Sequence, residues 1–554
     1  MITGMNAAQN EMIDRRPPGW MDWRWLPLLL FLIAAAARLI PGPRTIDDSY
    51  ITYRYARNLL AGEGFVYNPG ERVLGTTTPL YTSLMALAAL PSGGVEAPFA
   101  SLAWLINVLA DGLTCMLLFA IGRRLGYAWA GLGAALAWAV APFSVTFAIG
   151  GLETSVYILL LTGMIYAHWQ SRHLLAALLA CLALFTRPDA LILIGLVALD
   201  RAGQLFKAWR IARGGEGPKP RFPWSEVLVF GLPTLAWIVF SSVYFGSPLP
   251  HSIAAKSVAY HLSAEEGFIR LLQHYATPFL EHLTFSIYWI AVGMALYPFL
   301  FLIGAWQGLR TAPRLWPFAV YPWLYFAVFA AANPLIFRWY LSPPLPAYML
   351  FILIGAENLI TRLGSAIARR RSPTSLEQEK APAGWVLQAA LAILVVAAPA
   401  ALSLREWRLR PDHGLARPAP DMAWYKLELL YRQAADELAP EISQAQGETP
   451  TLAAGDVGVL GYFSGARILD TLGLNSPQST RYYPLDPALY VINYAIPPQL
   501  ILDEQPDYLV ILEVYGRAGL LQEARFWEQY RLRRKIPTDI YGSDGLLILE
   551  RKAR

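Results

Sequence analysis

The chain has 554 residues, of which 55% are hydrophobic and only 15% are charged, and its mean hydropathy is +0.37. Soluble domains carry a more even mixture, so this composition indicates an integral membrane protein. The net charge of +5 does not indicate a nucleic-acid partner, because the basic residues lie in short loops between apolar runs. Cys115 and Cys181 fall inside apolar runs, which argues against a disulfide framework or a zinc site.

A membrane-spanning helix needs about 20 apolar residues, and about eleven such runs are found in the first 403 positions. They lie near 25–42, 99–121, 127–148, 155–171, 173–186, 189–206, 224–245, 283–306, 316–334, 338–360 and 385–403. The first run follows Arg15 and Arg16 and has no clear small-residue cleavage site, so we expect a retained helix.

The basic loops predict the orientation of the chain, because Lys and Arg are retained on the cytoplasmic side. One side collects Arg15 and Arg16, Arg123 and Arg124, Arg172, the 201–221 loop, Arg310 and Arg314, and the 362–380 loop. The opposite side then holds the 44–97 segment, the later outward loops and everything after residue 403. We therefore expect a multi-pass protein of the plasma membrane whose outward loops are extracytoplasmic.

The sequence divides into a membrane part, residues 1–403, and a C-terminal part, residues 404–554. The C-terminal part has an amphipathic helix pattern, "DMAWYKLELLYRQAADELAP", and short apolar runs such as "YLVILEV" and "GLLILER". These patterns predict a small extracytoplasmic α/β domain. Its "AGDVGVLGYFSG" stretch lacks the G-x-G-x-x-G spacing of nucleotide loops, so Asp456 is interpreted as a helix cap or a structural hydrogen-bonding group.

The first outward loop, residues 44–97, begins with two adjacent carboxylates, Asp47 and Asp48. The following "SYITYRYARNLLAG" has helical spacing, with Arg54 and Arg57 near one face. One aspartate is readily explained as a helix cap that complements the helix dipole. A cap does not easily explain both aspartates, because two adjacent negative charges repel each other. The pair must be offset by nearby cations or serve a function.

A type II turn at Pro69–Gly70 and a second short helix after Thr78–Pro79 are expected later in this loop.

A carboxylate with Arg residues nearby suits group transfer to a hydroxyl, where a base removes a proton as the acceptor attacks. The leaving group needs positive charge, and a lipid phosphate at the membrane surface would be neutralised by Arg187, Lys256 or Arg338. Each cation also has an ordinary explanation. Arg187 would pair with Asp189, Lys256 would anchor a helix at the interface, and Arg338 would snorkel.

Other polar residues of the outward loops and spans remain open between two interpretations. Glu153 in "GGLETS" is equally suited to a helix N-terminus and to a site. Asp111, inside a span, is costly in lipid unless it is paired, and we interpret it as a contact between helices. His251 is a lone histidine and is not assigned as a metal ligand.

An ordered set of segments resembles the GT-C glycosyltransferases, in particular the branch that includes the terminal cell-wall arabinofuranosyltransferases. The segments are "DDSYITYRYARNLLAGEGFVYNPGERVLGTTTPLYTSLMAL", "GGLETSVY", "LFTRPDAL", "YFGSPLPHSIAAKS", "FRWYLSPPLPAYML" and the tail "AAGDVGVLGYFSGARILDTLGLNSP". The resemblance covers nearly the whole chain and implies a membrane enzyme that transfers a pentofuranose or hexose from a polyprenyl-phosphate donor. The implied acceptor is a hydroxyl of a cell-envelope glycan, lipid or glycoprotein on the outer face.

The resemblance also implies roles for individual residues. Asp47 matches the leading acid of the family's acidic pair and is expected to be the general base of an inverting transfer, with Asp48 in the second position. Arg187, Lys256 and Arg338 lie in matching segments. From charge and side of the membrane, and not from the resemblance, we expect the substrate and donor-phosphate site to include Arg54, Arg57, Glu153, Arg187, Lys256, Arg338 and Tyr340. An acidic pair is compatible with a divalent cation, but the outward loops hold no dense carboxylate cluster, so no metal is assigned.

A transporter or flippase of lipid-linked sugars is the alternative class of function. Transporters commonly have repeated halves with a site near the midplane. This chain instead concentrates its polar residues in outward loops and adds an outer domain. A scaffold that merely anchors the C-terminal part is a further alternative, and in that case the outward loops would be dispensable.

Overall fold

The structure, a computed structural model, describes residues 24–215, 218, 220–279, 287–371, 383–405, 407–408, 419–420 and 425–552. Arg15, Arg16 and residues 372–380 of the last basic loop, which entered the prediction of orientation, lie outside the described residues.

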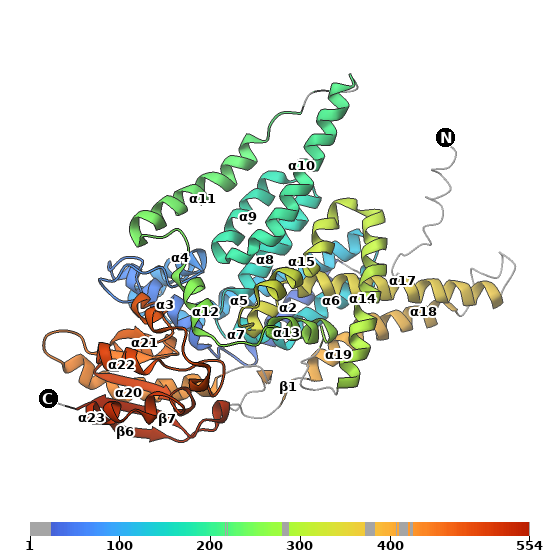
Figure 1. Ribbon diagram of the computed structural model, residues 1–554. Coiled ribbons are helices and arrows are strands. Elements are labelled where there is room, and N and C mark those ends of the chain that lie inside the picture. Colours follow the sequence, from blue (N-terminus) through green and yellow to red (C-terminus); the bar gives the residue numbers. More distant parts are fainter. Residues whose placement is uncertain are drawn as a thin grey trace.

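The membrane part is a bundle of apolar helices, coloured from blue through green to yellow in Figure 1. Its helices are α2 (Leu26–Leu39), α5 (Phe99–Arg124), α6 (Ala128–Val140), α7 (Pro142–Ile149), α8 (Thr154–Trp169), α9 (His173–Thr186), α10 (Leu191–Arg213), α11 (Trp224–Phe245), α14 (Ile287–Thr311), α15 (Trp316–Ala332), α17 (Leu345–Arg371), α18 (Ala383–Leu391) and α19 (Ala398–Arg405). Every expected span overlaps one of these helices. This agreement is expected physically, because a single apolar segment in lipid can form all of its backbone hydrogen bonds internally only as a helix.

Not all of these helices are long enough to cross a membrane by themselves. Among the described residues, six helices have the length and apolarity of a span, or seven if α6 and α7, which meet at a 46° bend, form one span. The helices α2 and α9 are apolar but shorter. The protein is therefore a polytopic helical membrane protein, and a total of about eleven spans stays a prediction.

A buried ion pair ties the N-terminal half of the bundle together. Arg38 of α2 donates from Nε to Oδ2 of Asp111 in α5 at 2.8 Å, and neither side chain has exposed surface. Arg38 also donates to Ala139 of α6 and Ser144 of α7, while Ser155 of α8 donates to Asp111. Asp111 is thus a contact between helices, as interpreted from the sequence.

Two short helices form the loop between α2 and α5. They are α3 (Asp47–Leu60) and α4 (Pro79–Ala89). Between them the backbone N–H of Glu71 donates to the carbonyl of Asn68, and Gly70 has a φ of +82°, as the expected type II turn requires.

Thr78 precedes the first residue of α4, but its side chain makes no capping hydrogen bond. Its hydroxyl lies against those of Thr52 and Thr76 instead. Other short helices outside the spans include η3 (Pro188–Ala190), α12 (His251–Ala259), α13 (Glu266–Ala276) and α16 (Arg338–Leu341).

The C-terminal region, residues 425–552, contains a five-stranded sheet of order β4-β3-β5-β7-β6. Its elements are α20 (Lys426–Gln444), β3 (Thr451–Ala454), α21 (Gly458–Ser464), β4 (Arg467–Asp470), α22 (Pro498–Glu504), β5 (Tyr508–Leu512), α23 (Ala524–Gln529), β6 (Tyr530–Ile536) and β7 (Leu546–Arg551). The strands β4, β3 and β5 are parallel, and β7 is antiparallel to β5 and β6. A separate two-residue pairing joins β1 (Trp407–Arg408) to β2 (Ala419–Pro420).

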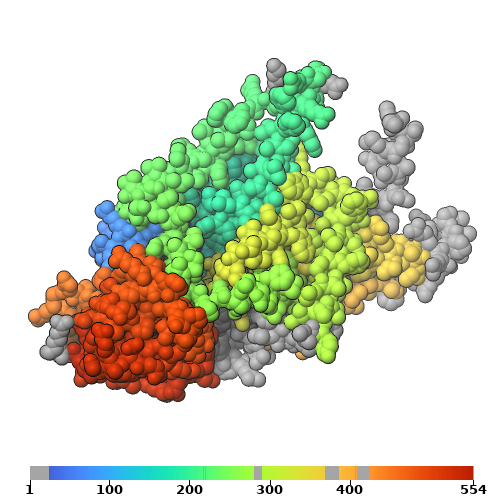
Figure 2. Space-filling model, in the orientation of Figure 1, coloured from blue at the N-terminus to red at the C-terminus, as the bar shows by residue number. Residues whose placement is uncertain are grey.

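The parallel strands are apolar on both faces, as strands covered on both sides must be. Nearly every residue of β3, β4 and β5 is buried. Figures 1 and 2 show this region, in orange and red, gathered at one end of the molecule beside the green α12 segment, and Figure 1 also shows the blue α3 next to it.

Candidate functional site

The beginning of α3 is fixed to the loop that follows α7. The backbone N–H groups of Arg44 and Ile46 donate to the carbonyls of Ile149 and Gly150 at 2.8 and 2.9 Å. The hydroxyl of Ser49 donates to the same Gly150 carbonyl at 2.7 Å. The acidic pair that opens α3 is therefore held in place by the membrane part of the chain.

Asp47 is held on its other side by the C-terminal region. Its Oδ2 accepts the backbone N–H of Gly458 at 2.8 Å, and its Oδ1 accepts that of Val459 at 2.7 Å. Its own N–H donates to Oε1 of Glu428 at 3.0 Å. Asp47 thus caps α21 rather than its own helix, and both of its carboxylate oxygens are engaged by the protein.

Burial raises the pKa of Asp47 well above its usual value, and the negative charge of Asp456 adds to this, while the Val459 N–H opposes it. Gly458 is required for this contact, because a Cβ at that position would lie 1.8 Å from the Asp47 carbonyl oxygen.

Asp48 occupies a different position, in the wall between two cavities. Cavity 1 has a volume of about 380 Å³ and cavity 2 about 650 Å³. Asp48, Lys256 and Tyr260 line both. Burial raises the pKa of Asp48, and the nearby Lys256 ammonium opposes the rise. Asp48 therefore borders both cavities, whereas Asp47 borders cavity 1 alone and has both carboxylate oxygens engaged by backbone donors.

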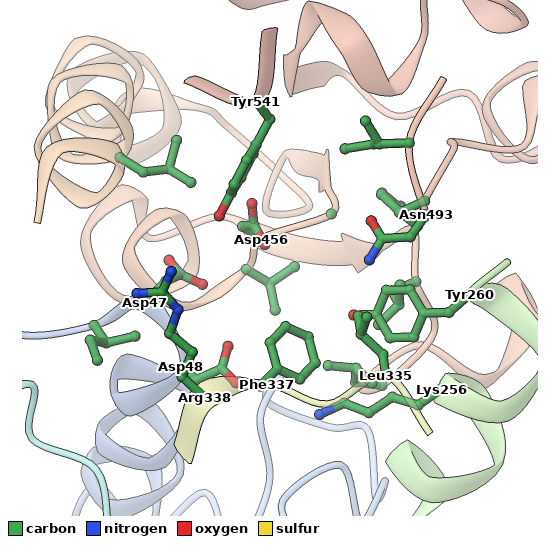
Figure 3. Close-up of a pocket in the computed structure, with 18 of the residues that line it drawn as sticks. Asp47, Asp48, Lys256, Tyr260, Leu335, Phe337, Arg338, Asp456, Asn493 and Tyr541 are labelled. Carbon is green, nitrogen blue, oxygen red and sulfur yellow. The ribbon is translucent and has the colours of Figure 1, made fainter. Parts of the chain in front are cut away.

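Cavity 1 lies between α3 and the C-terminal region. In Figure 3, Asp48, Arg338 and Lys256 line its lower side and Tyr541 and Asn493 its upper side, with the ribbon colours assigning the upper wall to the C-terminal region.

Two more carboxyl groups, Glu428 and Asp456, belong to cavity 1. Oδ2 of Asp456 accepts the hydroxyl hydrogen bond of Tyr431. Burial raises the pKa of Asp456 to about 6. Burial and the Asp47 charge raise the pKa of Glu428 well above its usual value.

Cavity 2 extends from the acidic pair toward the membrane helices. It is lined by Phe329 and Ala332 at the end of α15 and by Glu153, Arg187 and Tyr340. The apolar lining from a membrane helix indicates a cavity that can admit an apolar chain.

Arg187 has its charge balanced within the protein. It donates from Nε and a terminal nitrogen to both oxygens of Asp189 at 2.9 and 3.2 Å, and to Oε1 of Glu153 at 3.5 Å. Its guanidinium also lies 4.8 Å from the ring centroid of Tyr340. The pairing with Asp189 expected as the ordinary explanation is therefore present, and Glu153 and Tyr340 join it.

Lys256 and Arg338 lie closer to the acidic pair. Burial opposes the charged form of Lys256, yet Tyr340 and Asp48 outweigh it and raise the pKa of the ammonium group. Its Nζ lies 5.2 Å from the ring centroid of Phe337. Arg338 lines cavity 1 only.

Arg54 and Arg57, which were expected at the phosphate site, line neither cavity, so the structure does not bring them together with the other candidate residues. Arg54 is buried and donates to the carbonyls of Tyr67, Gly461 and Ala466. Arg57 donates to the Tyr462 carbonyl at 3.0 Å. Both guanidinium groups therefore join α3 to the α21 segment, and Arg54 also binds the Tyr67 carbonyl in the loop after α3.

Sequence reasoning did not assign Glu428, Asn493 or Tyr541 to the site, and it interpreted Asp456 as structural. Asp456 had a usable signal, since a Gly-Asp pair directly after an apolar strand marks the carboxyl end of a strand in an α/β sheet. The other three carry no local motif. Within the described residues, no group of three or more His, Cys, Asp and Glu side chains has the arrangement of a metal site.

Parts of the sequence are similar to known proteins. A family model described as a domain of unknown function, DUF8728, matches residues 425–548. A curated relative, the terminal β-(1→2)-arabinofuranosyltransferase of Mycobacterium tuberculosis (strain ATCC 25618 / H37Rv), is 29% identical over 231 residues. This match covers 38% of the chain and 35% of the relative, so it spans about a third of that protein.

Solved structures match over nearly the whole chain. ArnT from Cupriavidus metallidurans, bound to undecaprenyl phosphate, has a TM-score of 0.51 at 15% identity, covering 95% of this chain and 96% of that one. The oligosaccharyltransferase AglB from Archaeoglobus fulgidus, in complex with an inhibitory peptide and a dolichol-phosphate, has a TM-score of 0.50 at 13% identity, covering 91% and 72%. Both are GT-C glycosyltransferases. The chain has the GT-C fold, and within that class it is similar in sequence to the terminal arabinofuranosyltransferases.

Proposed function

We propose that the protein is an integral-membrane glycosyltransferase that moves a sugar from a polyprenyl-phosphate donor to a hydroxyl of a cell-envelope acceptor. The observation that carries the proposal is the wall shared by the two cavities, where the Asp48 carboxylate and the Lys256 ammonium both face open space. A base beside a cation is what transfer from a phosphate to a hydroxyl needs.

In the proposed reaction the acceptor hydroxyl oxygen attacks the anomeric carbon of the donor sugar. The bond between that carbon and the phosphate oxygen breaks, and its electron pair leaves with the polyprenyl phosphate. The hydroxyl proton passes to Asp48, and Lys256, which lines both cavities, offsets the charge on the phosphate. A single displacement of this kind inverts the anomeric carbon.

The base is assigned to Asp48 rather than to Asp47, which the resemblance favoured. Both oxygens of Asp47 already accept backbone N–H groups of α21. Burial raises the pKa of both acids, so basicity does not separate them, but Asp48 borders both cavities and lies beside Lys256. Asp47 then serves to hold the beginning of α3.

The similarity to an arabinofuranosyltransferase supports a pentofuranose, specifically arabinofuranose, as the first sugar to test. The undecaprenyl phosphate bound to ArnT supports a polyprenyl phosphate as the carrier. The positive-inside pattern supports an extracytoplasmic site and C-terminal region. We retain the division at residue 403 into a membrane part and a C-terminal domain.

The alternative of a lipid-linked sugar flippase has less support. An intramembrane acid such as Asp111 would mark a transport path if it faced a cavity, but here it is neutralised by Arg38 inside the bundle.

The test is turnover by the purified protein in detergent, where no sealed membrane exists. Labelled arabinofuranosyl and hexosyl polyprenyl phosphates are each incubated with short octyl glycoside acceptors, and we expect transfer of one sugar to an acceptor hydroxyl. Absence of transfer from every donor, together with lipid flipping in sealed vesicles, would identify the protein as a transporter.

A further inference from the structure

Cavity 1 lies at the edge of the C-terminal sheet where the parallel strands end. Gly455 and Asp456 follow β3, Leu472 follows β4, and Tyr515 follows β5, and all four line the cavity. Tyr541 precedes β7, which is antiparallel to β5 and therefore begins at the same edge. Ligands of open α/β sheets bind at this edge, because the loops there converge while the strands hold them rigidly.

One buried carboxyl oxygen in the wall of cavity 1 has no hydrogen-bond partner among the described residues. Glu428 is 6% exposed, and its Oε1 accepts the Asp47 N–H. Within the described part of the chain, its Oε2 has no hydrogen-bond partner. Buried polar atoms are nearly always paired, so an unpaired carboxyl oxygen in a cavity wall points to a group supplied by a ligand.

Tyr541 stands at the outer wall with an unusual backbone conformation. Its φ is +55°, a value that bulky residues rarely adopt, and it is 54% exposed although it lines the cavity. Tyr260, Tyr494 and Tyr515 line the cavity as well. Aromatic rings of this kind offer apolar faces to the C–H groups of a sugar.

We propose that cavity 1 binds the terminal sugar of the acceptor, a neutral polyhydroxylated ring, with Glu428, Asp456 and Asn493 as hydroxyl partners and Tyr541 as an aromatic platform. This inference rests on the proposed transferase function. Carboxyl and amide groups both accept from and donate to hydroxyls. Four acidic residues line the cavity together with Lys256, Arg270 and Arg338, so the charges largely offset one another, which suits a neutral polyhydroxylated ring.

The location of cavity 2 supports a separate site for the lipid donor. Only cavity 2 is lined by the end of the membrane helix α15, so the lipid donor has its apolar entry there. Asp48 in the shared wall then lies between the donor sugar and the acceptor hydroxyl, where a base must stand.

Two variants test the assignment, each with purified full-length protein. Tyr541→Gly removes the ring and relieves the positive φ, so it should keep or raise the melting temperature. Asn493→Ala removes the amide. We expect each to weaken binding of an octyl glycoside acceptor about tenfold, measured by titration calorimetry, with an equal rise in acceptor KM and an unchanged donor KM. Tyr482→Ala, at a tyrosine outside both cavities, is the control and should bind as the wild type does.

The probes are octyl arabinofuranoside and octyl mannopyranoside. Unchanged acceptor binding in both variants, a shift in donor KM instead, or a wild-type protein that binds neither glycoside would overturn the assignment. Wild-type binding that depends on Tyr541 and Asn493 without any transfer would leave the subsite standing and refute the transferase function instead.

Discussion

Asp47 and Asp48 show how far neighbouring residues on one helix can differ in role. Successive side chains of a helix point about 100° apart, so two adjacent acids cannot face the same partner. Asp47 is directed at the N-terminus of α21, and Asp48 at the cavities.

Asp48→Asn should lower kcat about 100- to 10,000-fold, the usual contribution of a general base, while the melting temperature changes little. The measurement is a transfer assay in detergent beside a thermal unfolding curve. Asp47→Asn is the matched comparison. It should destabilise the protein more, because an amide cannot accept from both backbone N–H groups. A full loss of transfer in Asp47→Asn with unchanged stability and normal activity in Asp48→Asn would return the base to Asp47.

The pH profile reports on Asp48 separately. The base works when it is ionised, so kcat/KM should fall as the pH drops through the raised pKa of Asp48. In Lys256→Gln the opposing cation is lost, the ionised carboxylate is less favoured, and its pKa rises further. The acidic limb of the profile should therefore move to higher pH, whatever the loss in rate. An acidic limb at the same pH in Lys256→Gln and in the wild type would show that Lys256 does not influence the pKa of the base.

At the level of single residues, the sequence predicted which charged side chains lie near the acidic pair only in part, and it did not predict what they contact. Lys256 and Arg338 were identified from charge and position in the chain, and both line a cavity. Arg54 was assigned to phosphate on the same grounds and instead binds carbonyls of α21, more than 400 residues away in the chain. Such partners depend on tertiary packing, which no local spacing reveals.

Among the elements, α21 is the one on which the site geometry depends most. It is a short helix of the C-terminal region, and its first N–H groups are capped by an acid from the opposite end of the chain. A capped N-terminus also complements the helix dipole, so the contact stabilises both partners.

Gly458→Ala tests this contact. The added Cβ would lie 1.8 Å from the Asp47 carbonyl oxygen, so α3 and α21 must separate. Overpacking of this kind costs about 1–3 kcal/mol. We expect a lower melting temperature, faster proteolysis of the C-terminal region and reduced transfer. Gly203→Ala in α10 is the matched control, because a Cβ there meets no atom within 4 Å, and it should leave all three measurements unchanged.

The Arg38–Asp111 pair is the corresponding link inside the membrane. Removal of one partner of a buried pair leaves an uncompensated charge and costs about 3–5 kcal/mol. Asp111→Asn should accordingly lower the thermal stability of the purified protein. A joint change of both residues to Leu, which leaves no buried charge, should recover part of it. Equal stability of Asp111→Asn and the wild type would show that the pair does not hold the bundle.

The elements themselves were largely predictable. Each apolar run coincides with a helix, since hydrophobic length is a local property of the sequence. The lengths of the helices were harder to predict. A single apolar run contains both α6 and α7, because Pro142 lacks a backbone N–H and interrupts the helix there.

At the scale of the whole molecule, α3 with its acidic pair and the C-terminal region lie together at one end, and the basic connection between α10 and α11 lies away from them (Figure 1). Their packing requires that α3 and residues 425–552 lie on the same side of the membrane. The side itself is a prediction from the distribution of Lys and Arg.

Single cysteines test the orientation. In a background with Cys115 and Cys181 replaced by Ala, Glu523→Cys and Arg213→Cys each place one thiol on an exposed position. A membrane-impermeant maleimide should label Glu523→Cys in right-side-out vesicles and Arg213→Cys only after detergent is added. Labelling of both from one side would refute the proposed topology.

The contact between Asp47 and α21 also has a consequence for biosynthesis. A ribosome makes Asp47 early and its two N–H partners only 411 and 412 residues later. Asp47 therefore gains its two backbone donors only after α21 has been translated, whereas the bonds from Arg44, Ile46 and Ser49 to the end of α7 can form as soon as residue 150 has been made. The last contact that orders the acidic pair thus depends on the C-terminal region, and a chain cut short before residue 458 would lack it.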